Sequence, residues 1–489
     1  MKRARKSSAL GTENSNPTQL IQSFSISDLP SRILVGIFLT LPTKSIVFCK
    51  SVCKKWNTLI SNPHFSKLHF AQAKPQFLLR TRDSTRSSRT LFLVDIEENG
   101  TGFNRENESH TPNKPSIILN TKLKIPLRNA EVLLNNNNND EGPNNKGNRR
   151  LKLKPKDHNY NIVNSCKGLL CLSEHSRNDP VAVANPVTGE FVKLPRTCND
   201  LDCKTFVDCG LGFSPKSKKF KVVRIFSGYT AVTERVVRQS YGKTVAEVHT
   251  LGTDSWRSVT GAVPYSFKKL AFPTYINGAL YAFCINNKES DCIVSFLFDN
   301  EQFEPVPLPP QWKWRPKRRN VSMGVLGVDQ LCVCDTSDVE TTKIWVMKDD
   351  GVSKSWTQFF TIYTDWPCGL CQPLNHFKNG ALLMFSNCLQ ELIYSDQKHF
   401  RDKYLGIHGL KSRYEAIVHT PSFVSLKDIV VGPRGTVDIL NINSRCGKLK
   451  LQGETKTHYL VEQHKEMGPL NCSSNEVEVK YWTKHFWSK

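Results

Sequence analysis

Apolar residues between positions 29 and 60 recur at steps of one, three and four, which places their side chains on one face of a helix. The first stripe consists of Ile33, Leu34, Ile37, Phe38 and Leu41. The last stripe consists of Val52, Cys53, Trp56, Leu59 and Ile60, and Ile46 with Val47 supplies the apolar contacts between the two. Pro42 ends the first helix, and Pro63 stops the last one. The segment therefore predicts three short amphipathic helices.

This helical segment is small for a unit that has to fold by itself. A domain of about 40 residues rarely buries enough apolar surface to be stable without a metal, a disulfide or a partner. The segment also holds no recognisable catalytic group. We therefore interpret it as a docking module, with an ordinary helical hairpin packed on its own chain as the alternative.

Downstream of the module, short apolar runs follow Gly or Asn-Gly turns at regular intervals. The runs begin near Gly168, Gly278, Asp329 and Gly380, which are separated by steps of 110, 51 and 51 residues. The first step is about twice the others, and the runs 210–213 and 220–225 fill it. One further interval leads to the strand-like run 436–440. The period, rather than any single strand, indicates a repeat architecture.

A second element accompanies each run: a turn that leads into an aromatic residue and alternating apolar positions. It is found at 185–191, 251–256, 298–303 and 348–356. The turn residues allow a tight reversal, and the aromatic ring can pack between neighbouring sheets. Repeats of about 50 residues, each long enough for roughly four strands, favour a β-propeller or a related closed β array. A two-sheet β-sandwich stays open, because alternation alone does not separate the two.

The helical segment resembles the F-box in its plant form. The matching positions, in the order and spacing of that family, are Leu29, Pro30, Ile33, Leu34, Ile37, Leu41, Pro42, Lys44, Ser45, Val52, Cys53, Lys54, Trp56, Leu59, Ile60, Pro63 and Phe65. The segment departs from the family at Arg32, where an acidic residue is usual, and at Lys50-Ser51, where Arg-Cys is common. These are surface-type positions, so they bear on the strength of docking.

The repeats resemble the kelch-like F-box-associated domain that follows plant F-boxes. The resemblance spans residues 77–426 and rests on the stretches 165–171, 185–186, 194–195, 212–213, 221–223, 248–251, 254–257, 277–278, 326–327, 331–332, 344–347 and 355–356. Residues 422–426 look like the usual end of that domain. The resemblance thus implies an α+β multidomain chain, a small three-helix F-box followed by an all-β repeat domain.

Composition places the boundaries of these parts. Residues 1–26 are polar and predict a disordered basic tail, and the resemblance implies an F-box at 27–70 and the β-repeat domain at 71–428. Within the last, residues 97–156 are rich in Asn and Lys and predict an insertion loop, although 117–119 and 132–134 can add short strands. Residues 429–489 predict a C-terminal extension with a last β element and a basic aromatic tail.

Length and charge narrow the functional class. The chain of 489 residues has no apolar run long enough for a membrane span and no signal-peptide pattern, so we expect it in the nucleus, the cytoplasm or both. Many of the 16 cysteines lie in apolar runs, and we expect them reduced and buried. The net charge of +23 gathers in patches at 149–156 and 313–319. Such patches attract acidic partners, and the alternative function is a basic nucleic-acid-associated or chromatin protein.

No catalytic centre emerges from the motifs. Cys368 and Cys371 have the spacing of a redox or half zinc motif, but the surrounding β repeats offer neither a helix N-terminus nor a second pair of ligands. We therefore expect no enzyme activity, no metal site and no cofactor.

The F-box resemblance implies a substrate-receptor subunit of an SCF-type cullin-RING ubiquitin ligase. The F-box would dock on an SKP-type adaptor, linked to cullin and RING subunits, while the β domain would hold a protein target. The residues expected to divide between module core and adaptor surface are Leu29, Pro30, Ile33, Leu34, Ile37, Leu41, Pro42, Val52, Cys53, Trp56, Leu59 and Ile60. Trp56 is expected mostly in the core, and Leu29-Pro30 mostly at the interface. For target binding, the candidate residues are Trp312, Trp314, Arg315, Arg318 and Arg319.

Overall fold

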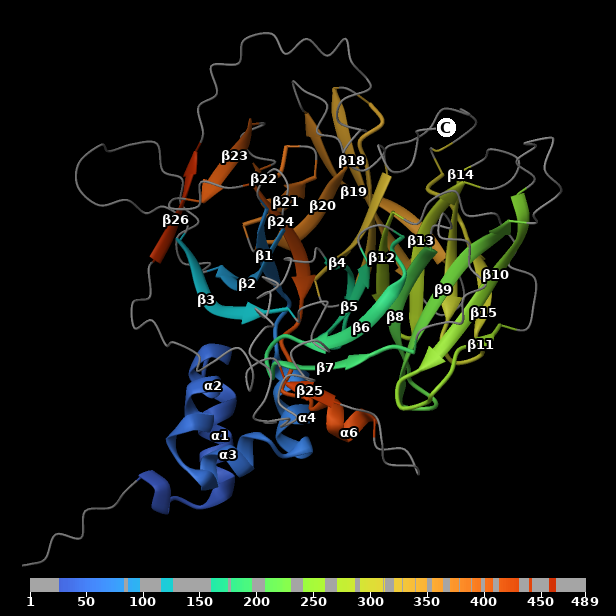
Figure 1. The fold of residues 1–489 in the computed structure, drawn as a ribbon. Coiled ribbons are helices and arrows are strands. Elements are labelled where there is room, and N and C mark those ends of the chain that lie inside the picture. Colours follow the sequence, from blue (N-terminus) through green and yellow to red (C-terminus); the bar gives the residue numbers. More distant parts are fainter. Residues whose placement is uncertain are drawn as a thin grey trace, which may run out of the picture.

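The protein is described by a computed structural model. The structure describes residues 26–82, 87–96, 116–125, 160–174, 177–195, 207–229, 241–259, 271–285, 291–310, 312, 321–327, 329–338, 340–349, 354–363, 370–377, 379–387, 389–396, 401–407, 413–430, 439–441 and 457–462. Two parts are evident in Figure 1: a helical module at one end and a ring of β-sheets beside it. Within the described ranges, no helix has the length and hydropathy needed to cross a bilayer.

The helical module contains one 3-10 turn and four helices, one more helix than the apolar stripes predict. They are η1 (Ile26–Asp28), α1 (Ser31–Thr40), α2 (Thr43–Val52), α3 (Lys54–Ile60) and α4 (Pro63–Gln72). Val52 belongs to α2, because Cys53 has an extended backbone and its Sγ accepts the N-terminal hydrogen bond of α3 from Trp56 N. Pro63 does not only stop α3: it also begins α4, which Asn62 caps through His64 N at 2.8 Å.

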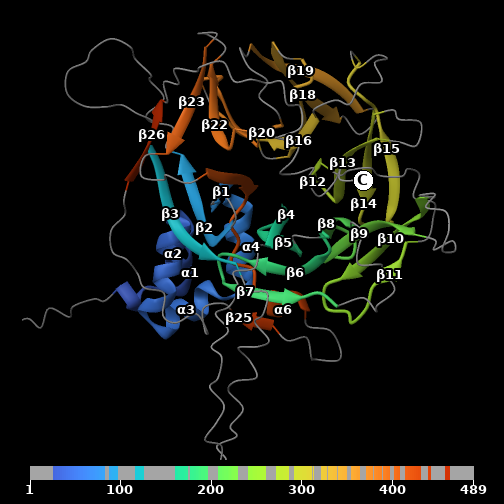
Figure 2. The same ribbon diagram turned by 45° about the horizontal axis from the view of Figure 1, so that its top comes forward.

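The β domain is a six-bladed propeller, and the β-sandwich alternative is wrong. Each blade is an antiparallel sheet of four strands, and Figure 2 shows the blades around a common centre. Blade 1 consists of β24 (Arg413–His419), β1 (Gln76–Arg82), β2 (Ser87–Ile96) and β3 (Ser116–Lys124). Blade 2 consists of β4 (Tyr160–Cys166), β5 (Leu169–Glu174), β6 (Pro180–Asn185) and β7 (Glu190–Lys193). Blade 3 consists of β8 (Val207–Ser214), β9 (Lys219–Tyr229), β10 (Tyr241–Thr250) and β11 (Arg257–Ser258).

The remaining blades repeat the same order. Blade 4 consists of β12 (Ala271–Ile276), β13 (Ala279–Ile285), β14 (Asp291–Leu297) and β15 (Gln302–Val306). Blade 5 consists of β16 (Val321–Leu326), β17 (Gln330–Asp335), β18 (Thr341–Asp349) and β19 (Lys354–Tyr363). Blade 6 consists of β20 (Cys371–His376), β21 (Leu382–Ser386), β22 (Glu391–Asp396) and β23 (Arg401–Ile407). The first strand of each blade, with β24 for blade 1, lies innermost, and contacts join β24 with β4, β4 with β8, β8 with β12, β12 with β16 and β16 with β20.

The ring closes through strands from both ends of the domain. In blade 1, β24 pairs with β1 along its whole length, from His419 opposite Gln76 to Arg413 opposite Arg82. The strand expected one interval further on, at 436–440, is therefore not part of a further blade. The short strand found there, β25 (Ile439–Asn441), instead adds to the outer edge of β7.

The turns that mark the sequence period join the first and second strands of the blades. In the first of these turns, φ is 46° at Lys167 and 83° at Gly168. In the turn of blade 4, φ is 44° at Asn277 and 89° at Gly278. This pair of positive φ values gives the tight hairpin turn whose twist matches the flanking strands. A Cβ on Gly168 would also overlap the side chain of Ser422.

The aromatic residues of the second sequence marker tie neighbouring blades together. Trp256 Nε1 of blade 3 donates to the Pro195 carbonyl that follows blade 2, at 2.9 Å. Trp356 Nε1 of blade 5 donates to the Pro307 carbonyl that follows blade 4, at 2.5 Å. The prediction that these rings pack between sheets is confirmed for both tryptophans.

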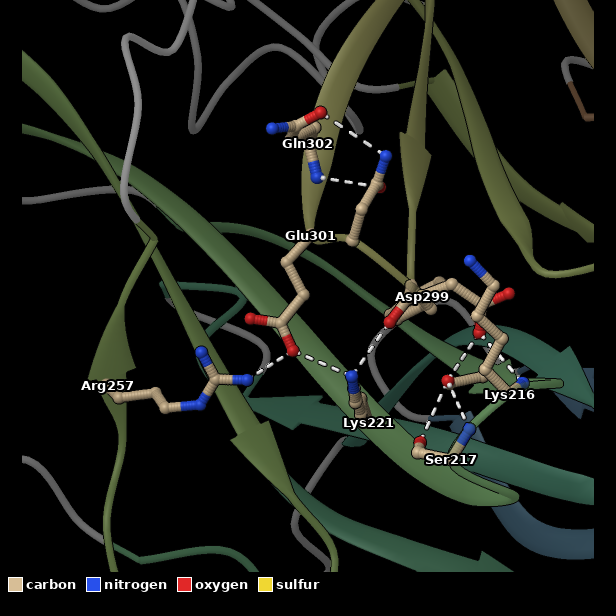
Figure 3. A network of polar contacts seen from close by, with 10 residues as sticks. Lys216, Ser217, Lys221, Arg257, Asp299, Glu301 and Gln302 are labelled. Atoms are coloured by element: carbon tan, nitrogen blue, oxygen red, sulfur yellow. Dashed lines mark hydrogen bonds and ion pairs between the residues drawn. The ribbon is translucent and has the colours of Figure 1, made fainter.

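A polar network, buried around Lys221 and Glu301, links blades 3 and 4 (Figure 3). Lys221 Nζ donates to the Phe298 carbonyl and to Glu301 Oε1, both at 2.7 Å, and Arg257 also pairs with Glu301. Burial acts to raise the pKa of Glu301, but the hydrogen bonds from Arg257 and Lys221 outweigh it, so this pKa lies below its usual value. The network fixes the β14–β15 turn against strand β9.

After β24, the chain returns to the helical end of the propeller and then to its outer wall. It forms α6 (Leu426–Val430), then β25, and β26 (Thr457–Glu462) pairs with both β23 and β3. This strand joins blades 6 and 1 into one nine-stranded sheet. The stretch 97–156, expected as an insertion loop, includes the blade strand β3, as the apolar run 117–119 suggested. The run 132–134 lies outside the described residues.

Candidate functional site

Exposed apolar side chains gather on the helical module. Of the seven large hydrophobic residues exposed in the described part of the chain, five lie between residues 26 and 52. These five, exposed by 38% to 63%, are Ile26, Ile33, Ile37, Phe48 and Val52. Single exposed apolar residues are ordinary on a protein surface, whereas a gathered set marks an interaction site.

Two helices present most of these side chains in pairs one turn apart. Ile33 and Ile37 are four residues apart on α1, and Phe48 and Val52 are four residues apart on α2. Residues at this spacing lie on the same face of a helix. Each pair therefore forms a short apolar ridge directed to solvent, and we call the two together the exposed ridges.

The other faces of these helices build the core of the module. Its buried members are Leu34, Phe38, Ile46, Ile60 and Phe65, together with Val187 and Phe423 from the propeller domain. The rings of Phe38 and Trp56 meet edge to face, with centroids 5.1 Å apart. The core thus contains none of the ridge residues, which stay exposed to solvent.

Comparison with known families identifies both parts of the chain. Residues 26–68 match the F-box domain, and residues 117–418 match the F-box associated beta propeller domain. The chain belongs to this family of F-box proteins. Its relatives include F-box protein At3g07870 of Arabidopsis thaliana, 27% identical over 81% of this chain and 91% of the relative. F-box protein CPR1 of the same plant is 24% identical over 86% of this chain and 92% of the relative. These homologues support a plant origin.

Solved structures add only a general likeness of fold. The Aleuria aurantia lectin is 8% identical, with 72% of this chain and 96% of the lectin covered and a TM-score of 0.29. The β-propeller domain of the Trilobed protease from Pyrococcus furiosus is 10% identical, with 68% of this chain and 98% of that chain covered and a TM-score of 0.26. At these TM-scores the likeness carries no argument.

The structure divides the F-box residues named from the sequence into three groups. Leu34 and Ile60 are fully buried, so they support the module from inside. Those turned to solvent are Pro30, Ile33, Ile37, Pro42 and Val52, and those partly buried are Leu29, Leu41, Cys53, Trp56 and Leu59. Their contact with an adaptor stays a prediction.

Two exposed residues of the F-box were not among those named. Phe48 precedes Val52 by one helical turn, and this spacing was the signal that could have found it. Ile26 lies in η1, ahead of the first recognised motif residue, Leu29, and no pattern marks it. Both enlarge the exposed apolar surface of the F-box.

The F-box and the propeller share an apolar joint centred on Phe423. This ring is 4.8 Å from the ring of His69 and 5.9 Å from that of Phe65, and both contacts are edge to face. Ser66 Oγ, buried in α4, donates to the Phe423 carbonyl at 2.9 Å. Lys167, in the first turn of blade 2, also lies over the ring of Phe70 at 5.8 Å. We call these contacts the F-box joint.

Polar groups of blade 2 hold the segment that carries Phe423. Asn185 is fully buried, and its Nδ2 donates to the carbonyls of Ser422 and Val424 at 3.0 and 2.7 Å. Glu190 Oε2 accepts from Leu426 N at 2.7 Å. Burial lowers the pKa of Lys50 on α2, and the charge of Glu190 acts in the opposite direction. The F-box therefore meets a fixed surface of the propeller.

Two buried histidines lie at this end of the propeller. Burial lowers the pKa of His69 to about 4 and that of His419 to about 3, so both are neutral at physiological pH. Ser165 Oγ is 2.9 Å from His419 Nδ1, across the boundary between blades 2 and 1. Protonation of either ring would place a charge in an apolar interior.

The structure separates Trp312 from the rest of the predicted target patch. Trp312 is buried, and its ring meets Phe283 edge to face at 6.0 Å in the core between blades 4 and 5. A target or a nucleic-acid base would not reach this indole without repacking the core. Trp314, Arg315, Arg318 and Arg319 lie outside the described residues, and their role stays a prediction.

Most cysteines in the described blades are buried and serve packing, whereas Cys292 in β14 is partly exposed. Cys166, Cys171, Cys332, Cys334 and Cys371 are all buried, and burial raises the pKa of the Cys332 thiol. Cys368, the other half of the predicted dithiol pair, lies outside the described residues. Across the described ranges, no three His, Cys, Asp or Glu side chains come together as metal ligands would.

Proposed function

We propose that this protein is the substrate-recognition subunit of an SCF-type cullin-RING ubiquitin ligase, in which the F-box docks on an SKP-type adaptor and the propeller binds a protein target. The observation that carries the proposal is the pair of exposed ridges on α1 and α2. They lie outside the core that the F-box shares with Val187 and Phe423 of the propeller, within a domain that matches the F-box.

Apolar burial supplies the energy of docking in this proposal. Covering a Val, Ile or Phe side chain completely is worth roughly 1.5–3 kcal/mol. The four ridge residues are about half exposed, so each contributes on the order of 1 kcal/mol when an adaptor covers it. Their sum is a large part of a micromolar affinity, which corresponds to about 8 kcal/mol.

The protein acts by proximity rather than by bond chemistry. Holding a target on the same scaffold as the ubiquitin-loaded enzyme raises the effective concentration of the target lysine. A fixed geometry between the two binding surfaces serves this purpose, and the F-box joint supports it. In this proposal the chain itself catalyses nothing, and its partners carry out the transfer.

Strand direction favours the propeller rim opposite the F-box for the target. The innermost strands run toward the F-box, since the turn after β4 carries Lys167, which contacts Phe70 of α4. The longer connections, such as those after β7 and β9, therefore leave from the opposite rim. Binding residues are commonly found on the loops of a rigid scaffold.

The docking claim is tested by charge placed in a ridge. We expect Ile33→Asp with Ile37→Asp to weaken binding to a purified SKP-type adaptor at least 100-fold in isothermal titration calorimetry, because two carboxylates would be buried without partners. Asn57→Asp, at an exposed position on α3, is the matched control and should bind like wild type. Equal adaptor affinity of the ridge variant and wild type would refute the proposal.

A further inference from the structure

The F-box helices carry charge of nearly one sign. Residues 26–72 contain a single acid, Asp28, against six basic residues. The six are Arg32, Lys44, Lys50, Lys54, Lys55 and Lys67. One carboxylate does not neutralise them, so the F-box has a net positive charge.

Two of these lysines have partners within the protein. Lys55 Nζ donates to the Leu29 carbonyl at 3.1 Å, which ties α3 to the start of the module. Lys50 lies close enough to Glu190 of the propeller for that charge to act on its pKa. Both side chains therefore have a place in the structure of this chain.

Three others, Arg32, Lys44 and Lys54, point to a requirement outside the chain. Arg32 and Lys54 are exposed, and Lys44 is partly buried. None of the three forms an ion pair within the part of the chain that the structure describes. We call them the ridge cations.

The ridge cations accompany the exposed ridges along the helices. Lys44, Phe48 and Val52 follow one another in steps of four residues, so Lys44 extends the α2 ridge by one turn. Arg32 directly precedes the first residue of the α1 ridge. Lys54 begins α3, two residues after the end of the α2 ridge. A partner that covers the ridges is therefore brought close to these cations.

Each ridge cation lies in the first turn of its helix, where it lowers local stability. Arg32 is the second residue of α1, Lys44 the second of α2 and Lys54 the first of α3, and none of these helices has an acid in its first turn. The helix dipole favours anions at this end and opposes cations. Residues that act against the local stability of a fold are expected where a functional requirement acts. The stability of the F-box therefore does not explain the ridge cations.

We propose that the adaptor covers the exposed ridges with an acidic surface, whose carboxylates face the ridge cations. This inference rests on the proposed function for the identity of the partner and adds the charge of its surface. Opposite charges steer two proteins together and act mainly on the association rate. Apolar contacts such as those of the ridges act mainly on the dissociation rate.

The test measures both rates for the full-length protein and a purified SKP-type adaptor by surface plasmon resonance. For the wild type, the association rate should fall at least about tenfold between about 50 and about 500 mM NaCl, because salt screens the attraction between the two surfaces. The dissociation rate should change little over the same range. Ile33→Asp with Ile37→Asp should show the opposite pattern at fixed salt, with its main effect on dissociation.

Charge reversal locates the effect on the three helices. Arg32→Glu with Lys44→Glu and Lys54→Glu should lower the association rate at about 50 mM NaCl at least about tenfold and remove most of its salt dependence. The same variant should unfold at the same or a higher urea concentration than wild type, because the new acids match the helix dipoles. A structural role of the cations would move the urea midpoint in the other direction.

A matched pair of single variants controls for the net charge of the chain. Lys44→Glu should lower the association rate at least about threefold. Lys348→Glu makes the same change in charge at an exposed position on β18, which lies away from α1–α3 in Figure 1, and should leave both rates unchanged. Equal effects of the two single variants would overturn the proposal.

The outcomes distinguish this proposal from the docking claim. Adaptor binding that resists salt, or equal association rates of the triple variant and wild type, would overturn the acidic surface and leave docking intact. A lower urea midpoint of the triple variant would mean that the cations stabilise the F-box, which also contradicts the proposal. Loss of binding to phosphatidylserine vesicles with unchanged adaptor rates would assign the cations to an anionic membrane instead. Absence of any adaptor binding by wild type would overturn both claims.

Discussion

Truncating Phe423 tests whether the F-box takes part of its stability from its contact with the propeller. This side chain is 3% exposed and contacts Phe65 and His69 of α4, although it lies more than 350 residues after them. Phe423→Ala removes a buried ring, which ordinarily costs about 3–5 kcal/mol. The hydrogen bond from Ser66 goes to the backbone carbonyl and remains possible in the variant. The loss therefore falls mainly on apolar packing at the F-box joint.

Hydrogen exchange measured by mass spectrometry localises this loss. A loss of 3 kcal/mol corresponds to roughly a 100-fold fall in protection, since 1.4 kcal/mol is a factor of ten. We expect the amides of α4 and α1 to lose about that much protection, while those of blades 4 and 5 keep theirs. The matched control is Phe298→Ala, which removes a fully buried ring inside the propeller. It should lower protection in blades 3 and 4 and leave α4 nearly unchanged.

The reasoning fails if the two variants give the same exchange pattern. Equal loss everywhere in Phe423→Ala would mean that the F-box and the propeller unfold together, so that the loss is not local to the F-box joint. Unchanged α4 protection would mean that the F-box is stable without the joint. Adaptor titration of Phe423→Ala adds a second measure, because loosening of the F-box core should weaken docking without any change in the exposed ridges.

Further predictions address the interface, the blades and pH. Leu29→Ala with Pro30→Ala should abolish co-purification of the adaptor while circular dichroism of the β domain is retained, and normal co-purification would contradict the assigned surface. Lys221→Met should lower the free energy of unfolding by about 1–3 kcal/mol in urea titration, because Glu301 and the Phe298 carbonyl lose a buried donor; an unchanged midpoint would show that the network of Figure 3 adds nothing. Stability should fall as pH drops from about 6.5 toward 4, by up to about 1.4 kcal/mol per unit for each buried histidine, since the unfolded chain takes up protons that His69 and His419 refuse in the folded state. His69→Leu should flatten that slope in urea midpoints measured from pH 7.5 to 4.5, and a slope equal to that of wild type would exclude His69 as a cause.

The sequence period predicted the β-propeller because each blade uses the same kind of turn and the same kind of contact between blades. The Gly168 and Gly278 turns and the Trp256 and Trp356 contacts recur at the same place in their blades, so the sequence carries their period. The closure of the ring of blades could not be predicted from the period. It depends on pairing between Gln76 and His419, which are remote in sequence and carry no shared pattern.

The apolar helical stripes located the F-box, but they did not separate the residues of its core from those on its exposed surface. Leu34 and Ile37 are both apolar and belong to one stripe, yet the first is fully buried and the second is 41% exposed. Spacing assigns residues to a helix face only within about one hundred degrees, and a wide stripe can pack on one side and bind on the other. Trp312 failed as a surface candidate for a related reason: a tryptophan beside basic residues looks exposed in sequence, but Phe283 of another strand covers it.

The position of Phe423 in the sequence also determines when the F-box core can be completed during synthesis. The helices of the F-box leave the ribosome first, but Phe423, which belongs to their core, leaves after all six blades. A nascent or prematurely ended chain therefore lacks both the last strand of blade 1 and the residue that completes the F-box core. Under the proposed function, recruitment to the adaptor would thereby be coupled to completion of the chain, and truncated products would not compete with finished receptors for adaptor.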